Sequence, residues 1–179
     1  MIASATIPGR KVIAGAIDCS TLASIAVVAT EREPHPLQLE AWRSFLEVHA
    51  RVTELLDAEL RAQRDLPLGW YDVLVQLSEA GGRRRMSELA DAVLLSRSNC
   101  TRLVDRLDAA GLVGREPDPA DARVRWAVLT DTGRARLKDA SSAHLAGVER
   151  AFTSFVDDDA AKVLVSVFHP IIDALRARR

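Results

Sequence analysis

The residues best suited to chemistry in this sequence form a polar, arginine-bearing stripe between residues 96 and 106. Its members are Ser96, Arg97, Ser98, Asn99, Thr101, Arg102 and Arg106. These types match the groups that DNA presents, because Arg binds guanine in a bidentate manner, Asn binds adenine, and Ser or Thr bind bases or phosphates. The stripe contains no catalytic motif, so it predicts recognition of nucleic acid rather than catalysis.

A helix over about 97–110 positions this stripe on one of its faces. Its opposite face is apolar at helical spacing, through Cys100, Leu103, Val104 and Leu107. We expect Ser96 to cap the start of the helix and Gly111 to end it in the left-handed conformation. A shorter helix over 87–94 and a tight turn at Leu95–Ser96 come first. This order is the layout of a helix-turn-helix, whose second helix enters the major groove.

After residue 111 the pattern changes from helical to extended. Leu112–Val113 and Val124–Leu129 are predicted as strands, joined by a turn-rich segment over 117–123. A two-stranded ribbon behind a helix-turn-helix is a wing. It would carry Arg123 and Arg125 on or near its tip.

Several spaced elements in this window resemble the winged helix of the MarR (multiple antibiotic resistance regulator) family. They are Thr101-Arg102, Asp105-Arg106-Leu107, Gly111-Leu112-Val113, Arg115, Asp121-Ala122-Arg123, and Leu129-Thr130 with Gly133. The resemblance implies that Arg102 reads the major groove and that Arg123 reaches the minor groove. It also implies a mainly α fold, with a small two- or three-stranded β-wing and with dimerisation helices at both ends of a winged helix-turn-helix.

The flanking organisation resembles this family from about residue 37 to residue 179. We therefore expect a single MarR-like domain over 37–179, preceded by an extension over 1–36. Within the domain, 67–130 is the predicted winged-helix DNA-binding region, and 37–66 and 131–179 are the predicted dimerisation helices. The last helix has a wide apolar stripe that a partner subunit explains. Pro170 lies inside it and is expected to kink or break it.

Three further features of the DNA-binding region have predicted structural roles. Asp105 is expected to pair with Arg102, three residues earlier on the helix surface, and so to aim the arginine. Asp121 is expected to brace the wing arginine in the same way. A loop of three arginines over 83–85 either contacts phosphate or is simply solvated, and the sequence leaves both open.

A candidate ligand pocket follows only from the resemblance. MarR-like proteins often hold small phenolic or amphipathic ligands beside their second helix, here predicted over 68–80. The residues that would line such a pocket are Trp42, His49, Trp70, Tyr71 and Asp72. The competing interpretation is that these are ordinary core aromatics and a packed histidine.

Composition is consistent with one soluble globular domain that has a real core, since the chain has 179 residues and is 48% hydrophobic. Its formal net charge is −1, but residues 83–136 contain 11 basic and 8 acidic residues, against 13 and 17 in the rest. This excess of basic residues in the middle of the chain is consistent with a DNA-facing surface there. The apolar run near the N-terminus is interrupted by Asp18, so we predict no exported or membrane form and a cytoplasmic protein.

An enzyme is the competing class, and the sequence argues against it. It contains no glycine-rich phosphate loop, no nucleophile elbow and no HExxH motif. We therefore predict no catalytic residue, no metal site and no cofactor. The sequence predicts a homodimeric regulator that binds a pseudo-palindromic double-stranded operator. The resemblance implies a repressor that is relieved by a small aromatic or amphipathic effector.

Three alternatives to a ligand-responsive regulator stay open at this point. The first is an oxidant sensor that works through Cys100 or Cys19, since such regulators occur in the resembling family. The second is a winged-helix module that binds protein, and the third is a sequence-independent, architectural DNA-binding protein.

Overall fold

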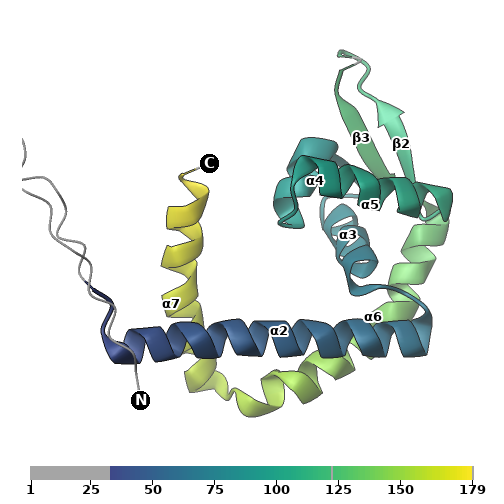
Figure 1. Ribbon diagram of the computed structural model, residues 1–179. Helices are drawn as coiled ribbons and strands as arrows, with labels where there is room; N and C mark the ends of the chain where they lie inside the picture. Colours follow the sequence, from purple (N-terminus) through teal and green to yellow (C-terminus); the bar gives the residue numbers. More distant parts are fainter. Residues whose placement is uncertain (1–32, 122, 179) are drawn as a thin grey trace, which may run out of the picture. The chain divides into compact units, whose positions relative to one another are not determined.

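The computed structural model describes residues 33–121 and 123–178 (Figure 1). Their elements are α2 (Pro36–Arg64), α3 (Leu68–Glu79), β1 (Arg83–Arg85), α4 (Met86–Ala92), α5 (Arg97–Ala109), β2 (Val113–Pro117), β3 (Arg125–Leu129), α6 (Asp131–Ala151), the 3-10 turn η1 (Thr153–Phe155) and α7 (Asp158–Arg176). The chain divides into two compact units, Met1–Ala41 and Trp42–Arg179. All the elements after the start of α2 belong to the second unit, and the predicted mainly α fold with a β-wing is confirmed.

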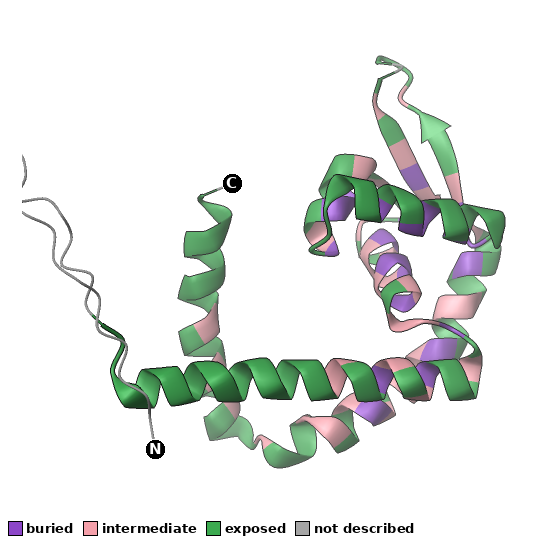
Figure 2. Ribbon diagram, in the orientation of Figure 1, coloured by how far each residue is buried: buried purple, intermediate pink, exposed green. Residues whose placement is uncertain are grey.

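The buried core lies between α3, α4, α5 and the base of the sheet (Figure 2). The four apolar positions predicted for the second helix of the helix-turn-helix are all buried: Cys100, Leu103, Val104 and Leu107. They meet the buried face of α3, which supplies Tyr71, Val73, Leu74 and Leu77. Burying one leucine or valine side chain stabilises the fold by about 1.5–3 kcal/mol. The orientation of α5 is therefore determined by its apolar face.

Three antiparallel strands in the order β1-β3-β2 form the sheet. The prediction of a loop at 83–85 was wrong, because these arginines form the edge strand β1. Arg83 pairs with Val128 and Arg85 pairs with Trp126, so β1 satisfies the backbone groups on one side of β3. The strand β2 is longer than predicted, and its last residue, Pro117, pairs with Arg125.

The boundaries of α5 and α6 follow the predicted caps. The Asn99 amide donates to Ser96 Oγ, and Gly111 ends the turn after α5 with φ of 70°. Thr130 Oγ1 accepts from the Gly133 amide at 2.9 Å. A side chain at Gly133 would place its Cβ 2.0 Å from the Leu112 carbonyl oxygen, so this close approach requires glycine. The helix α6 ends at Ala151, and the 3-10 turn η1 separates it from α7.

The helix α2 packs on α6 through its C-terminal half. A Cβ on Gly147 would lie 2.7 Å from Leu56 Cδ2, and Arg150 donates to Glu59 Oε2 at 2.7 Å. The N-terminal half of α2 contacts α7 through Phe45 and Phe168, whose ring centroids are 5.4 Å apart.

The helix α7 continues through Pro170, so of the two expected effects of this proline, a kink or a break, the break does not occur. Proline has no backbone N–H, so α7 lacks the hydrogen bond that residue 170 would otherwise donate. No residue of α7 is buried, although it carries Val163, Val167, Ile171 and Leu175. Among the helices in the described ranges, none is both long enough and apolar enough to cross a membrane.

A strained residue lies in the turn between α4 and α5. Leu94 has φ of 55° and is 80% exposed. A non-glycine residue in this left-handed region destabilises the folded state by roughly 1–2 kcal/mol. Glycine would remove this strain, but it would also cost about 0.5–1 kcal/mol because it loses more backbone entropy on folding. We expect Leu94→Gly to raise the free energy of unfolding by about 1 kcal/mol, or the Tm by about 2–4 °C, measured by thermal denaturation.

The matched control for this prediction is Ala110→Gly. Ala110 has φ of −84° at the end of α5, so glycine relieves no strain there and should lower the Tm. If the two variants shifted the Tm in the same direction, strain at Leu94 would not be the cause.

Candidate nucleic-acid interface

The outer face of α5 is fully exposed and carries the residues predicted to bind DNA. Arg102 Nη2 donates to Asn99 Oδ1 at 2.5 Å, so these two side chains form one preassembled unit. The side chains of Arg97 and Arg106 form no hydrogen bond or ion pair with any residue in the described ranges. Guanidinium groups that no carboxylate neutralises remain available to bases and phosphates.

The hydroxyl-bearing residues at the start of α5 partly serve the helix itself. Ser96 Oγ accepts the Asn99 amide at 3.3 Å and lies 3.2 Å from Ser98 Oγ. Thr101 Oγ1 donates to the Arg97 carbonyl at 2.9 Å. The Thr101 oxygen retains its acceptor capacity. Ser96 is confirmed as the predicted cap.

Asp105 does not pair with Arg102, contrary to the prediction. Its Oδ1 lies 2.6 Å from Arg115 Nη2, on strand β2. Arg115 Nη2 also donates to the Thr101 carbonyl at 3.1 Å. The reason is tertiary: β2 passes beside α5, and a fixed guanidinium there competes better for the carboxylate than Arg102, which is held by Asn99. Asp105 therefore links the recognition helix to the wing.

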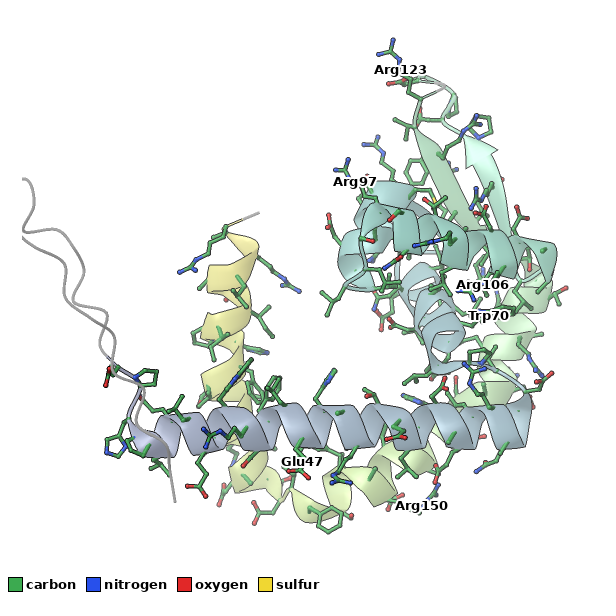
Figure 3. All side chains as sticks on the ribbon, in the orientation of Figure 1. Glu47, Trp70, Arg97, Arg106, Arg123 and Arg150 are labelled. Carbon is green, nitrogen blue, oxygen red and sulfur yellow. The ribbon has the colours of Figure 1, made fainter. Side chains whose placement is uncertain are left out.

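The wing tip presents Arg123 at its far end (Figure 3). Asp121 Oδ1 accepts the backbone amide of Arg123 at 2.9 Å. Asp121 thus braces the wing through the Arg123 backbone, whereas the prediction had an ion pair with its side chain. In the described part of the chain, the guanidinium groups of Arg123 and Arg125 have no acidic partner.

A hollow of about 340 Å³ opens between the wing and the helix-turn-helix. Its lining contains four arginines and two hydroxyl groups and no acidic residue: Arg85, Met86, Ser87, Thr101, Arg115, Arg123, Val124 and Arg125. Such a lining suits a phosphate oxygen. Sequence reasoning left phosphate contact by Arg85 open and did not assign Ser87 or Arg115 to this surface, because only the return of the wing onto α5 brings these residues together.

The arginines of β1 are not simply solvated. Arg84 Nη1 donates to Gln76 Oε1 at 3.1 Å. The guanidinium carbons of Arg83 and Arg85 lie 4.2 and 5.4 Å from the centroid of the Trp126 ring, which places both within the range of cation–π attraction. Arg85 alone of the three also lines the hollow between the wing and the helix-turn-helix.

The residues of the candidate ligand pocket fall into two groups. Trp42 and His49 flank Phe45 on the exposed part of α2, with ring centroids 5.9 and 6.3 Å away. Tyr71 is buried, and its ring lies 4.4 Å from that of His144 on α6. Trp70 is half-buried beside the core, and burial followed by the negative charge of Glu79 raises the pKa of Asp72.

Cys100 is fully buried under α5, and this burial raises the pKa of its thiol. A thiol with a raised pKa forms little thiolate, which is the form that reacts with oxidants. The geometry therefore gives no support to oxidant sensing through Cys100. Cys19 lies outside the described residues. In the parts of the chain that the structure describes, no three His, Cys, Asp or Glu residues cluster as metal ligands do.

Comparison with known proteins gives this surface a context. The MarR family model matches residues 64–124. AbsC, a MarR family transcriptional regulator from Streptomyces coelicolor, is 34% identical, with 82% of this chain and 99% of AbsC covered and a TM-score of 0.75. The chain belongs to the MarR family of transcriptional regulators. This family is not enzymatic, in agreement with the predicted absence of catalysis.

Two further relatives extend the comparison. Sco3205, a MarR family regulator from the same organism whose structure is a complex with DNA, is 30% identical, with 79% of this chain and 93% of Sco3205 covered and a TM-score of 0.74. IacR, a transcriptional repressor from Pseudomonas putida, is 27% identical, with 68% of this chain and 74% of IacR covered. The chain spans 60% of the length of another relative, the Bacillus subtilis regulator YkoM.

His144 packs against Tyr71 in a partly buried position, and we expect this burial to make the stability of the fold depend on pH. Its Nδ1 is buried and, among the described residues, has no hydrogen-bond partner, and burial lowers the pKa of the imidazole. The unfolded chain then binds a proton at a higher pH than the folded chain does. We expect the stability of the wild type to fall as the pH drops below about 6.5, the ordinary value for histidine.

The measurement is urea denaturation between pH 7.5 and 5, for wild type and for His144→Gln. The variant removes the titrating group, so its stability should depend less on pH across this window, whatever its stability at pH 7.5. Equal pH dependence in both proteins would show that His144 does not cause the effect.

Proposed function

We propose that this chain is a homodimeric, sequence-specific DNA-binding regulator of transcription that binds a pseudo-palindromic duplex. The observation that carries the proposal is the set of exposed guanidinium groups on α5 and at the wing tip that have no acidic partner among the described residues. Arg97 and Arg106 lie on the helix and Arg123 lies at the end of the wing (Figure 3). A protein surface with exposed guanidinium groups that no carboxylate neutralises is suited to binding a polyanion such as DNA.

The two parts of the surface have different expected roles. The helix α5 has the dimensions that the major groove admits, and Asn99 with Arg102 supplies base-reading groups at its exposed face. The wing extends beyond the helix and brings Arg123 toward the neighbouring minor groove or its phosphates. The hollow between them, lined by Arg85, Ser87, Arg115 and Arg125, takes backbone phosphate in this scheme.

A second copy of the chain is the proposed occupant of the apolar faces of α2 and α7. Phe45, Val167, Ile171 and Leu175 are all 41–57% exposed, although residues of these types favour burial. A contiguous apolar surface of this kind marks an interaction site. Two-fold pairing would present two copies of α5 to half-sites about one helical turn apart.

We further infer that the regulator acts as a repressor relieved by a small aromatic or amphipathic molecule. Its relative IacR is named a repressor, which supports repression rather than activation. The aromatic rings on α2, and Tyr71 with His144, supply apolar surfaces that suit such an effector. An effector would act by favouring a dimer in which the two α5 helices no longer match the operator spacing.

The direct test is fluorescence anisotropy on DNA from the gene's own upstream region and on a scrambled duplex, across a salt series. Wild type should bind the upstream duplex tightly and with strong salt dependence. Arg102→Ala should lower discrimination between the duplexes by about tenfold, since a bidentate base contact contributes about 1–3 kcal/mol. Arg123→Ala should weaken binding to both and flatten the salt slope by about one unit.

Arg51→Ala is the control for both variants. Arg51 is an exposed arginine that pairs with Glu47 on α2, away from the elements that form the proposed DNA surface. It should leave discrimination and salt slope unchanged. Equal binding of wild type to the two duplexes would instead favour an architectural role, and no binding to either would favour a protein-interaction module.

The dimer is tested separately by light scattering with size-exclusion chromatography. Wild type should have twice the chain mass of 19.5 kDa. Ile171→Asp places a charge on the proposed interface, where burial without a partner costs several kcal/mol, so it should shift the protein to monomer. Ala109→Asp, which adds the same charge at an exposed position of α5 outside the predicted dimerisation helices, should remain dimeric. A monomeric wild type would overturn the proposed dimer.

A further inference from the structure

The tip of the wing is weakly held by its own backbone. The ladder between β2 and β3 ends at the pair Pro117 and Arg125, and proline has no amide hydrogen to donate. Beyond that pair, the described backbone bonds are two, from the Asp118 amide to the Val124 carbonyl at 3.0 Å and from the Val124 amide to the Asp121 carbonyl at 2.9 Å. Something other than the ladder must therefore fix the tip that carries Arg123.

Asp118 holds the wing tip in place with both of its carboxylate oxygens. Its Oδ1 accepts the amides of Ala120 and Asp121 at 2.9 and 3.3 Å, which folds the tip around it. Its Oδ2 accepts the indole N–H of Trp126 at 2.8 Å. The hydrogen bond from the Trp126 indole, followed by that from the Ala120 amide, holds the pKa of Asp118 below its usual range, which favours the charged, accepting carboxylate.

Trp126 is in turn held by the strand that leads into the helix-turn-helix. Arg83 and Arg85 of β1 lie over its ring, at 4.2 and 5.4 Å from the centroid. Arg83 also lies 3.9 Å from Glu116, the β2 residue paired with Trp126. Since α4 begins directly after β1, these contacts form a continuous connection from the helix-turn-helix through Trp126 and Asp118 to the wing tip.

We propose that Trp126 is a positioning residue for DNA binding, which sets the place of Arg123 through its indole bond to Asp118. The proposal rests on the proposed function, because it assumes that Arg123 contacts DNA. It predicts a role for an aromatic residue on the outer face of the wing, which touches no base itself. The indole N–H is the essential group, and the ring serves to anchor it.

Trp126→Phe separates these two parts, because phenylalanine keeps an aromatic ring under the arginines and lacks the N–H. Operator binding should weaken about three- to tenfold, the range for loss of one hydrogen bond, and the salt slope should flatten toward that of Arg123→Ala. Asp118→Asn replaces one of the two acceptor oxygens with an NH2 group and leaves one oxygen for three donors, so it should have the same effect. Arg51→Ala, on α2 and outside the wing, is again the control and should bind as wild type.

The decisive experiment is a double-mutant cycle, in which operator binding by the single and double variants is measured by fluorescence anisotropy. If Trp126 acts through Arg123, then Trp126→Phe should cost nothing further in the Arg123→Ala background. The bond itself is read from nitrogen–proton NMR spectra of the full chain, in which the Trp126 indole signal should move when Asp118→Asn is introduced.

The outcomes are distinguishable. Additive losses in the cycle, or a Trp126→Phe protein that binds operator as wild type does, would overturn the positioning role. A wild-type protein that does not discriminate operator from scrambled duplex would instead overturn the proposed function on which it rests. An unmoved indole signal in Asp118→Asn would show that the bond does not form in solution.

Discussion

The burial of the apolar face of α5 is the interaction on which the DNA-facing surface depends. The core holds the apolar face of α5 against α3 and α4, through Cys100, Leu103, Val104 and Leu107. Burial of one face of a helix determines which residues lie on its exposed face. Arg102, Asn99 and Arg106 are exposed for this reason, and no force specific to the arginines is needed. The caps at Ser96 and Gly111 then limit the helix to the segment that carries these groups.

The wing depends on α5 in turn. Arg115 bonds the Thr101 carbonyl and pairs with Asp105, so the first wing strand is joined to the recognition helix by a charged contact near its middle. At the base of the wing, Gly133 of α6 lies so close to the Leu112 carbonyl that no side chain would fit there, and this contact joins the ribbon to α6. The two proposed DNA-contacting parts are therefore coupled through one small set of contacts. Charge in this region is arranged to hold elements together where it is paired, and is left free where DNA is proposed to bind.

The apolar faces of α2 and α7 have a different status from the core. Within the chain, α7 has no buried residue, yet its apolar stripe spans its whole length. Leaving such surface in water is unfavourable, which is the physical reason to expect a partner. The contacts of Gly147 with Leu56 and of Arg150 with Glu59 show that α6 is the element that joins this part to the winged helix. A molecule that changes the packing around His144 and Tyr71 acts where α6 meets α3.

Local chemistry in the sequence determined the elements and the surface they present. Helical spacing of apolar residues predicted α5, its caps and its buried face, and the residue types on the opposite face predicted the nucleic-acid interface. Turn-forming residues predicted the wing. These features depend on neighbours within a few positions, so the sequence contains them.

Only the tertiary structure decided which distant residues meet. Asp105 binds Arg115 instead of Arg102 because the strand β2 passes beside α5, and the three arginines at 83–85 form a strand because β3 has an open edge there. The bond from Trp126 to Asp118 likewise depends on the register of β2 against β3. Such pairings join residues through the folded backbone, and spacing along the chain does not determine them.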